Sequence, residues 1–435
     1  MDYPLEHIRS RFPALEAGDV FFDGPGGTQV PQAVIDAMAA YYRQANANEH
    51  GFFATSRRSD AVIAQARQAM ADFLNARSGD EIIFGANMTT LTLHLARTLG
   101  RIFKAGDEIV VTRLDHDANV APWLHLQEKG AVIRWLEIDP NDCTLQIGEL
   151  EKIINKKTRI VAVGYASNAF GTINDVPKII AAAKKAGALT FVDAVHYAPH
   201  RAIDVQALDC DFLACSPYKF YGPHSGVLYG KKEALERLQP YKVRPASDSI
   251  PDCFETGTKN HEGIAGVAAA IDFLAALGRD FGQGHALGLE GYAPGRRRWL
   301  KQALAAVTAH EMPLFARLLG GLLTIPGARV YGITDAKRFS ERTPTACFTL
   351  PGLAPALVAE KLGAQGICVW EGNYYAWEPM RFLGLEEKGG AVRAGLCLYN
   401  SAEEVDRFLD RLQKLSAVDQ PAQKRPFDGD GPVRA

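Results

Sequence analysis

The segment Phe212-Leu213-Ala214-Cys215-Ser216-Pro217-Tyr218-Lys219-Phe220-Tyr221-Gly222-Pro223 places a lysine just beyond a short apolar run. The apolar run is typical of a buried strand, and Gly222-Pro223 indicates a turn after it. Aromatic neighbours shield Lys219 from water, and desolvation disfavours an ammonium ion. A lysine in this setting has a lowered pKa and attacks an aldehyde more readily. The segment alone is equally compatible with a surface lysine in a loop.

A second strand, upstream, ends in a carboxylate. Phe191-Val192-Asp193 is followed by Ala194-Val195-His196-Tyr197-Ala198-Pro199-His200. Asp193 suits a place opposite a pyridine nitrogen, where a carboxylate keeps a cofactor ring protonated and electron-accepting. With His196 and His200 it also fits a metal site, and alone it fits a cap of the next turn. Asp193 and Lys219 lie 26 residues apart at the ends of consecutive predicted strands, so a parallel sheet brings both to one crevice.

Short β-branched runs alternate with amphipathic stretches from about residue 80 to residue 230. This alternation predicts an α/β fold with a mostly parallel sheet covered by helices on both faces. The predicted strands are 81–84, 108–112, 131–138, 159–164, 189–193, 211–215 and 226–229, and the helices between them include 89–102, 147–154 and 176–186.

The pattern changes after about residue 262 and predicts a smaller α+β domain. Its predicted helices are 263–278, 292–324, 355–363 and 402–415, and its predicted strands are 328–332, 345–350, 367–370 and 392–398. The end of the chain is rich in proline, glycine and charged residues, which predicts a disordered tail over 416–435.

Composition excludes several classes of protein. The 435 residues carry 48 Lys and Arg against 50 Asp and Glu, so the net charge of −2 predicts neither nucleic acid nor an anionic membrane as a partner. No apolar run is long enough to span a bilayer, and the N-terminus does not resemble a signal peptide. Seven scattered cysteines without a C-x-x-C pair favour buried thiols in a reducing compartment. We therefore expect a cytoplasmic protein.

The order Asp-x-x-His, then Asp211-Phe212 at a strand start, then Ser-x-x-Lys-x-Tyr-Gly-Pro resembles the class V aminotransferase family of fold-type I pyridoxal-5′-phosphate (PLP) enzymes. Within that family it is similar to the cysteine desulfurase-like branch, from about Phe21 to Leu412. The resemblance implies a homodimer whose large PLP-binding domain has a mostly parallel seven-stranded sheet. We expect that domain over 21–280, a small C-terminal domain over 281–415, and an N-terminal segment, 1–20, that packs with the small domain.

The resemblance assigns several residues to the cofactor. Lys219 matches the lysine that forms the Schiff base, and Asp193 matches the partner of the pyridine nitrogen. His196 lies where the family has a residue beside the ring hydroxyl, and Ser216 matches a phosphate ligand. Tyr218 replaces the family's usual phosphate-contacting histidine.

Four further segments extend the expected site. His116, in Asp115-His116-Asp117, matches the histidine that stacks on the cofactor ring. Thr89 opens a predicted helix after a strand, which is a ready anion site, although an ordinary helix cap explains it too. Asn168 lies near cofactor and substrate by resemblance, and Thr258 would reach the phosphate of the neighbouring subunit. Arg393 matches the arginine that grips the substrate carboxylate, a role suited to its planar fork.

The pattern departs from true cysteine desulfurases in one loop. They carry a nucleophilic cysteine that here falls at about Tyr375, within Val369-Trp370-Glu371-Gly372-Asn373-Tyr374-Tyr375-Ala376-Trp377. Cys368 lies seven residues earlier in a predicted strand, so a persulfide relay is not expected. Tyr374 and Tyr375 are candidate substrate-binding or acid–base residues, although a hydrophobic lid explains the aromatic cluster as well.

The expected activity is therefore PLP chemistry on an amino acid through a Schiff base with the substrate and a carbanion at its Cα. β-Elimination by a C–S lyase on cysteine or a cysteine conjugate comes first, and transamination or epimerisation is the alternative. Outside PLP chemistry, a metal-dependent hydrolase could use His116, Asp193, His196 and His200, although we expect no metal. A nicotinamide-dependent dehydrogenase lacks its G-x-G-x-x-G motif here.

Overall fold

A seven-stranded sheet occupies the middle of the chain in the computed structural model, which describes residues 3–418. The strands lie in the order β2-β8-β7-β6-β5-β3-β4, and only β8 runs antiparallel to its neighbours. Their bounds are β2 (Ile82–Gly85), β3 (Glu108–Thr112), β4 (Val132–Leu136), β5 (Thr158–Gly164), β6 (Leu189–Asp193), β7 (Phe212–Cys215) and β8 (Gly226–Gly230). The α/β fold and all seven predicted strands are confirmed.

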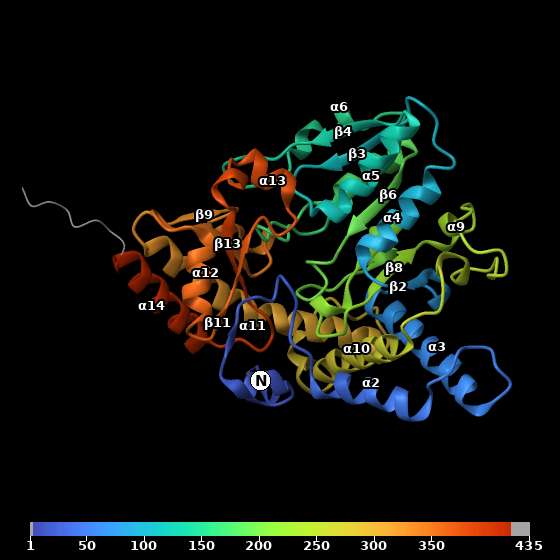
Figure 1. Cartoon of the computed structure of the whole chain (residues 1–435), viewed down its shortest axis with the longest axis horizontal. Helices are drawn as coiled ribbons and strands as arrows, with labels where there is room; N and C mark the ends of the chain where they lie inside the picture. The colour runs from blue at the N-terminus through green and yellow to red at the C-terminus, as the bar shows by residue number, and fades with distance from the viewer. Residues whose placement is uncertain (1–2, 419–435) are drawn as a thin grey trace, which may run out of the picture.

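Helices cover both faces of this sheet because alternate residues of each strand point to opposite sides. In β6, Phe191 packs in one hydrophobic cluster and Val192 in the other. The first face is covered by α4 (Met88–Leu99), α5 (Ala121–Leu124) and α9 (Lys232–Leu235). The second face is covered by α3 (Ala54–Leu74), α6 (Leu150–Ile153), α7 (Val176–Ala186), α8 (Val205–Leu208), α10 (His261–Phe281) and the first half of α11 (Arg296–Thr324). A further helix, α2 (Gln32–Gln44), packs outside α10 (Figure 1).

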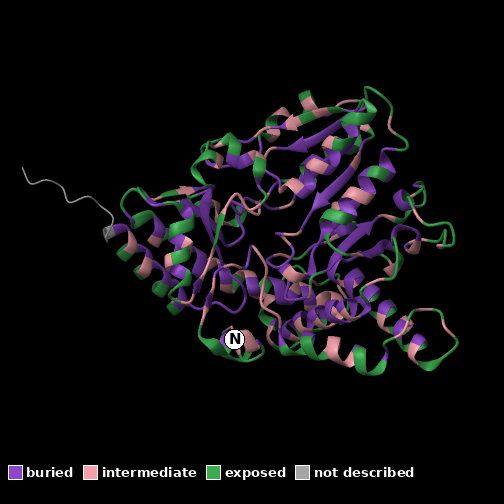
Figure 2. Cartoon of the chain, viewed as in Figure 1, coloured by how far each residue is buried: buried purple, intermediate pink, exposed green. Residues whose placement is uncertain are grey.

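A four-stranded antiparallel sheet forms the second part of the molecule, in the order β12-β13-β10-β9. It packs against the second half of α11 and against two later helices. The elements of this part after α11 include β9 (Arg329–Tyr331), β10 (Thr345–Thr349), α12 (Pro355–Gly363), β12 (Trp370–Gly372), α13 (Trp377–Phe382), β13 (Ala391–Gly395) and α14 (Ala402–Val418). Figure 2 shows that the strands of both sheets are mostly buried, whereas the outer faces of the helices are exposed.

The predicted strand 367–370 is two strands in the structure. Its first half, β11 (Ile367–Cys368), pairs in parallel with β1 (Val20–Phe21), and its second half joins the four-stranded sheet as β12. The sequence pattern missed β1 because a two-residue strand has no measurable periodicity. The second half, β12, leads into the loop that reaches the site.

Two helix boundaries also differ from the prediction. The helix predicted from residue 292 begins at Arg296, after Gly295 with a φ of 153°. α14 continues to Val418, because no glycine or proline interrupts the chain before Pro421. The predicted tail therefore overlaps the helix at 416–418, and the rest of it, 419–435, lies outside the described residues.

The N-terminal segment contacts residues from the C-terminal half of the chain. The ring of Tyr3 stacks on His310 with the centroids 3.9 Å apart, and its hydroxyl donates to the Leu398 carbonyl at 2.9 Å. Arg9 is the last residue of α1 (Leu5–Arg9), and its Nη1 donates to Glu404 Oε1 on α14 at 2.8 Å. The division into domains, including the packing of 1–20 with a small domain, stays a prediction.

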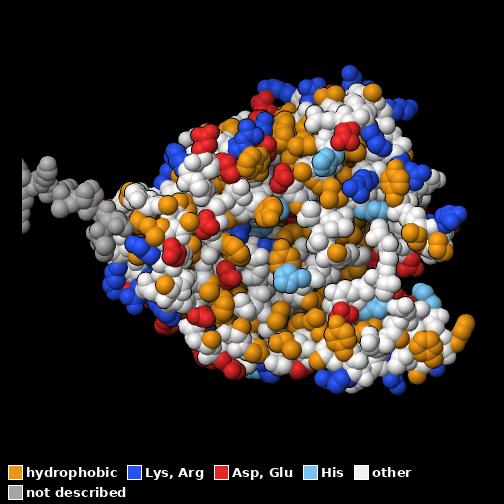
Figure 3. All heavy atoms as spheres, in the orientation of Figure 1, with side chains coloured by type: hydrophobic (Ala, Val, Ile, Leu, Met, Phe, Trp, Pro, Cys, Tyr) orange, Lys and Arg blue, Asp and Glu red, His pale blue; other side chains and the backbone are white. Residues whose placement is uncertain are grey.

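The surface carries charges of both signs, and Figure 3 shows hydrophobic side chains among them across the middle of one face. No helix among residues 3–418 combines the length and the apolar character that a membrane span requires.

Replacing Phe191 with alanine tests the packing of the central sheet. The ring is fully buried, so we expect Phe191→Ala to lower the free energy of unfolding by about 3–5 kcal/mol, as measured by urea unfolding. Ile102→Ala is the control, because Ile102 is 57% exposed and its loss should change stability by less than about 0.5 kcal/mol. Equal effects of the two substitutions would contradict this packing.

Candidate functional site

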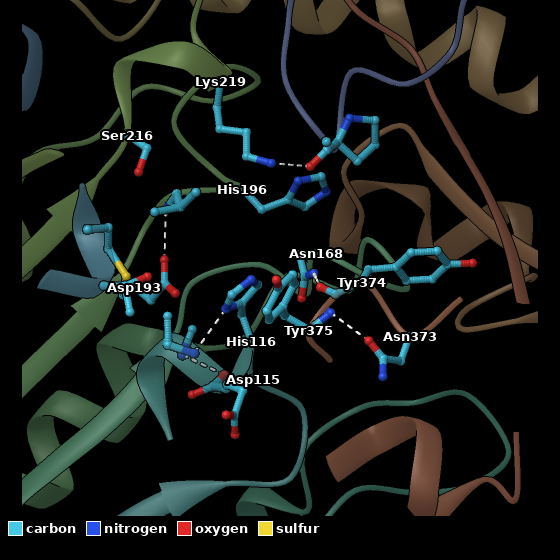
Figure 4. Close-up of a pocket in the computed structure, with 18 of the residues that line it drawn as sticks. Asp115, His116, Asn168, Asp193, His196, Ser216, Lys219, Asn373, Tyr374 and Tyr375 are labelled. Atoms are coloured by element: carbon cyan, nitrogen blue, oxygen red, sulfur yellow. Dashed lines mark hydrogen bonds between the residues drawn. The ribbon is translucent and has the colours of Figure 1, made fainter. Parts of the chain in front are cut away.

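One cavity of about 1100 Å³ lies beyond the carboxyl ends of the parallel strands. Its floor comes from the strand ends at Gly164, Asp193 and Ser216, and its opposite wall comes from Arg393 and the loop after β12. Ligands of open α/β sheets bind at this end of the strands, so the position fits a ligand site. Figure 4 shows Lys219, Asp193 and His116 around one space, with Tyr375 beside His116.

Lys219 is buried at the end of the short 3₁₀ turn that follows β7, with 8% of its surface exposed. Its Nζ donates to the carbonyl of Pro25 and lies 4.9 Å from the ring centroid of Tyr218. Burial, together with the positive charge of Arg393, lowers the pKa of Lys219 to about 7, although the carboxylate of Asp193 acts in the opposite direction. A substantial fraction of this amine is therefore neutral and nucleophilic at neutral pH.

Asp193 ends β6 and is buried beneath the cavity. Its Oδ1 accepts a hydrogen bond of 2.9 Å from the backbone N–H of Val195. Burial raises the pKa of Asp193 to about 6, whereas that hydrogen bond and the charge of Lys219 lower it. A cationic ring nitrogen near this carboxylate would stabilise the charged form further.

Asp115 is a second buried carboxyl beside Asp193, and the sequence reasoning did not single it out. It accepts from the Gly164 N–H at 2.8 Å and from Asn119 Nδ2 at 2.9 Å, and Gly164 is the register partner of Asp193. Burial and the charge of Asp193 raise the pKa of Asp115 to about 8. Asp115 thus holds a proton at neutral pH, which leaves Asp193 as the charged member of the pair.

The ring of His116 is held in one tautomer. Its Nδ1 accepts a hydrogen bond of 3.0 Å from the backbone N–H of Ala118, so a neutral ring carries its proton on Nε2. Burial and the charges of Lys219 and Arg393 lower the pKa of His116 to about 4, which keeps the ring neutral. The ring of Tyr375 stacks on it, with centroids 5.5 Å apart and planes 16° apart.

His196 connects the cavity floor to the second sheet. Its Nε2 lies 3.0 Å from Thr345 Oγ1 and 3.1 Å from Thr343 Oγ1, and burial lowers its pKa. The sequence reasoning did not identify either threonine, because they lie almost 150 residues away along the chain.

The alternative metal site receives no support from the geometry. His200 is paired with Glu311 at 2.8 Å. Among residues 3–418, no group of three or more His, Cys, Asp and Glu side chains is placed to hold a metal ion.

Arg393 and Asn168 leave two buried polar atoms without a protein partner. Arg393 Nη1 donates to the Asn168 carbonyl at 2.9 Å, and Asn168 Nδ2 donates to the Tyr374 carbonyl at 2.9 Å. Arg393 Nε and Asn168 Oδ1 are buried and make no hydrogen bond within the protein. Because buried polar groups in proteins are normally satisfied, these atoms indicate a polar ligand in the cavity.

The N-terminus of α4 forms the part of the cavity expected to take an anion. Asn87 caps the helix by accepting from the Thr90 N–H at 2.8 Å, and the hydroxyl of Thr90 bonds to the same oxygen. Thr89 and Ser216 line the cavity as well. A helix start flanked by two hydroxyls is suited to a phosphate group.

Eleven of the twelve site residues predicted from the sequence line this one cavity: Thr89, His116, Asn168, Asp193, His196, Ser216, Tyr218, Lys219, Tyr374, Tyr375 and Arg393. Thr258 does not, and lies exposed on the loop before α10. The donor set fits PLP, because it offers a buried amine for an aldehyde, a carboxylate for a ring nitrogen, an imidazole face for a flat ring and a helix start for a phosphate.

The loop after β12 closes the cavity in a strained conformation. Tyr374 and Tyr375 have φ values of 54° and 58°, which is uncommon for residues other than glycine. The guanidinium of Arg393 lies 4.3 Å from the ring centroid of Tyr374, whose hydroxyl donates to the Ala391 carbonyl. Such backbone strain persists where the surroundings enforce it, and it clusters at functional sites.

The chain is similar to known proteins over nearly its whole length. The model of the aminotransferase class-V family matches residues 20–296 and 297–408. A cysteine desulfurase of Pectobacterium atrosepticum is 33% identical, over 95% of this chain and 98% of that protein. The aminotransferase-like protein FGM3 of Gibberella zeae is 35% identical, again over 95% and 98%. The apo structure of the cysteine desulfurase from Thermococcus onnurineus NA1 has a TM-score of 0.85 at 30% identity, over 96% of this chain and 99% of that one.

The lowered pKa of Lys219 predicts an unusual pH profile for its reactivity. Trace acetylation of the cofactor-free protein, read by peptide mass spectrometry, should label Lys219 with a midpoint near pH 7 and not near the value of about 10.4 of an ordinary lysine. Because the carboxylate of Asp193 raises this pKa, Asp193→Asn should shift the midpoint to lower pH. A midpoint above pH 9 in the unaltered protein would refute the described burial.

Proposed function

The chain belongs to the aminotransferase class-V family, and we propose that it is a PLP-dependent enzyme that cleaves the C–S bond of cysteine or of a cysteine conjugate. The observation that carries the proposal is the buried amine of Lys219, with a pKa near 7, in one cavity with Asp193 and Arg393. The cysteine desulfurases similar to this chain support a sulfur-containing amino acid as the substrate.

Seven residues would hold the cofactor together with Lys219. Asp193 would bond to the ring nitrogen, His196 would lie beside the ring hydroxyl, and His116 would stack on the ring. The remaining four are Thr89, Ser216 and Tyr218 for the phosphate, and Asn168 beside the ring. When bound, PLP supplies an electron sink for a carbanion at the substrate Cα.

The protein's own groups would bind the amino acid and move its protons. Arg393 would hold the α-carboxylate, because its Nε is unpartnered and its planar fork suits two parallel hydrogen bonds. The neutral amine of Lys219 would remove the Cα proton. The ammonium of Lys219 formed in that step would return the proton to the departing sulfur, and the Nε2–H of His116, fixed by its tautomer, would donate a hydrogen bond to that sulfur.

The loop between β12 and α13 bears on the fate of the sulfur. A persulfide relay needs a thiol at about the position of Tyr375, and none of the described residues that line the cavity is a cysteine. Cys368 is half-buried in β11, and burial raises its pKa, which disfavours the thiolate. Elimination that releases a free thiol is therefore favoured over sulfur transfer to this chain.

Transamination is the second candidate, with epimerisation beside it. Each begins with the same removal of the Cα proton and differs only in where a proton returns. The 35% identity to an aminotransferase-like protein favours transamination as the runner-up. Tyr374 and Tyr375 would contact the substrate in each case.

We further propose a cytoplasmic homodimer in which Thr258 reaches the active site of the neighbouring subunit. Thr258 is exposed, but a buried ionic cluster holds the loop that carries it. Arg67 pairs with Glu255 at 2.8 Å, and Lys259 pairs with the same carboxylate at 3.1 Å. The domain limits proposed for each subunit are 1–20, 21–280 and 281–415, with α14 continuing to Val418.

Removing the amine tests the proposed chemistry. The PLP-loaded protein should release pyruvate and ammonia from cysteine or an S-alkylcysteine, and Lys219→Ala should lower kcat by at least about a thousandfold because the base is lost. Lys185→Ala serves as the control, because the Lys185 side chain is 82% exposed on α7. Product formation by Lys219→Ala at the unaltered rate would contradict the assignment.

Mixed dimers test the proposed role of Thr258. Thr258→Glu would repel the phosphate, so it and Lys219→Ala should each be inactive alone. Their co-expressed mixed dimer should regain activity, because one of its two sites combines an intact Lys219 with an intact Thr258.

The pair Lys219→Ala and Asp193→Asn is the matched control, because both residues lie in the same subunit's site and no mixed dimer restores it. Absence of activity in a purified dimer of Thr258→Glu with Lys219→Ala would rule out a contribution across subunits.

A further inference from the structure

Two exposed aromatic side chains stand at the rim of the cavity. Trp370 is 52% exposed and Tyr375 is 73% exposed, and both line the cavity that holds Lys219. From their placement we infer that the substrate is a cysteine S-conjugate whose sulfur carries an aromatic group, and that Trp370 and Tyr375 bind that group. This inference rests on the proposed C–S lyase activity and narrows its substrate class.

The backbone holds Tyr375 in place although its side chain faces solvent. Its N–H donates to Asn373 Oδ1 at 3.0 Å, and its carbonyl accepts from the Asp117 N–H at 2.7 Å. Asn373 is in turn anchored by donating to Glu386 at 3.1 Å. Hydrogen bonds at both its N–H and its carbonyl hold the backbone of Tyr375 at a φ of 58°. The exposed ring is therefore presented from an ordered backbone and is preorganised for binding.

Trp370 is positioned by the glycine-rich segment near the N-terminus. A Cβ added to Gly26 would collide with the indole of Trp370, so the glycine allows the ring to lie directly against the backbone there. Gly26 and its neighbour Pro25 also line the cavity, and the carbonyl of Pro25 accepts from Lys219. The indole is therefore placed by the same segment that contacts the reactive lysine.

The cavity also has apolar side chains where α4 and α5 line it. Leu93 on α4 and Ala121 and Pro122 at the start of α5 line the cavity. A volume of about 1100 Å³ is slightly above the usual range for sites that take drug-sized ligands, and it leaves room beyond a cofactor and an amino acid backbone. Free cysteine would leave this apolar space filled with water.

β-Elimination from a cysteine S-conjugate balances without a further reactant other than water. Loss of the Cα proton and cleavage of the Cβ–S bond, with the electron pair leaving on sulfur, convert the conjugate and one water into a thiol, pyruvate and ammonium. No oxidant, reductant or acceptor thiol is required. Desulfuration of cysteine to alanine would instead need a thiol to accept the sulfur, and no described residue lining the cavity supplies one.

The test compares S-benzylcysteine with S-methylcysteine, which both release an alkyl thiol and differ in the aromatic ring. The PLP-loaded protein should form pyruvate from S-benzylcysteine with a kcat/KM at least about tenfold higher. Tyr375→Ala and Trp370→Ala should each lower the ratio of the two kcat/KM values severalfold, whereas Tyr375→Phe should preserve it because the ring remains. Trp377→Ala is the matched control, because Trp377 is 41% exposed but does not line the cavity, and its loss should leave the ratio unchanged.

The possible results distinguish failure of this inference from failure of the proposed function. Pyruvate from both substrates without a preference for the aromatic one, or a preference that survives loss of both rings, overturns the inference and leaves the lyase proposal standing. Faster conversion of free cysteine to alanine and persulfide in the presence of an added thiol also overturns it. Absence of pyruvate from cysteine and from both conjugates overturns the inference and the lyase proposal together.

Discussion

Burial of the Lys219 amine is the interaction on which the rest of the site depends. An exposed lysine is protonated at neutral pH and cannot attack an aldehyde, whereas this one has a pKa near 7 because its burial and the positive charge of Arg393 disfavour the ammonium form. Asp193 opposes that shift only in part. The protonated Asp115 keeps a second negative charge away from the same strand ends, so one amine and one carboxylate remain as the reactive pair.

The second sheet completes the site and does more than cover it. β13 supplies Arg393, and Thr345 at the start of β10 holds His196. The loop after β12 supplies Tyr374 and Tyr375 in a conformation that costs about 1–3 kcal/mol per residue. The molecule tolerates that cost at the one loop where a desulfurase would carry its thiol, which fits a substrate-binding role for the loop.

The sequence predicted what local patterns control. Alternating strands and helices indicated the seven-stranded sheet, and the spacing of Asp193 and Lys219 predicted that both would lie at one edge of it. Contacts between distant segments left no local pattern. Asp115 was read only as a neighbour of His116, and its bond to Gly164 depends on the register of β5 with β6. The division of 367–370 into β11 and β12 likewise depends on the distant partners β1 and β13.

The most direct test of the central claim is chemical mapping of the cofactor attachment. The protein is loaded with PLP, reduced with borohydride and digested, and the peptides are sequenced by mass spectrometry. The account predicts a phosphopyridoxyl group on the peptide containing Lys219 and on no other lysine in stoichiometric amount. Attachment at a different lysine, or a protein that takes up no PLP at all, would contradict it.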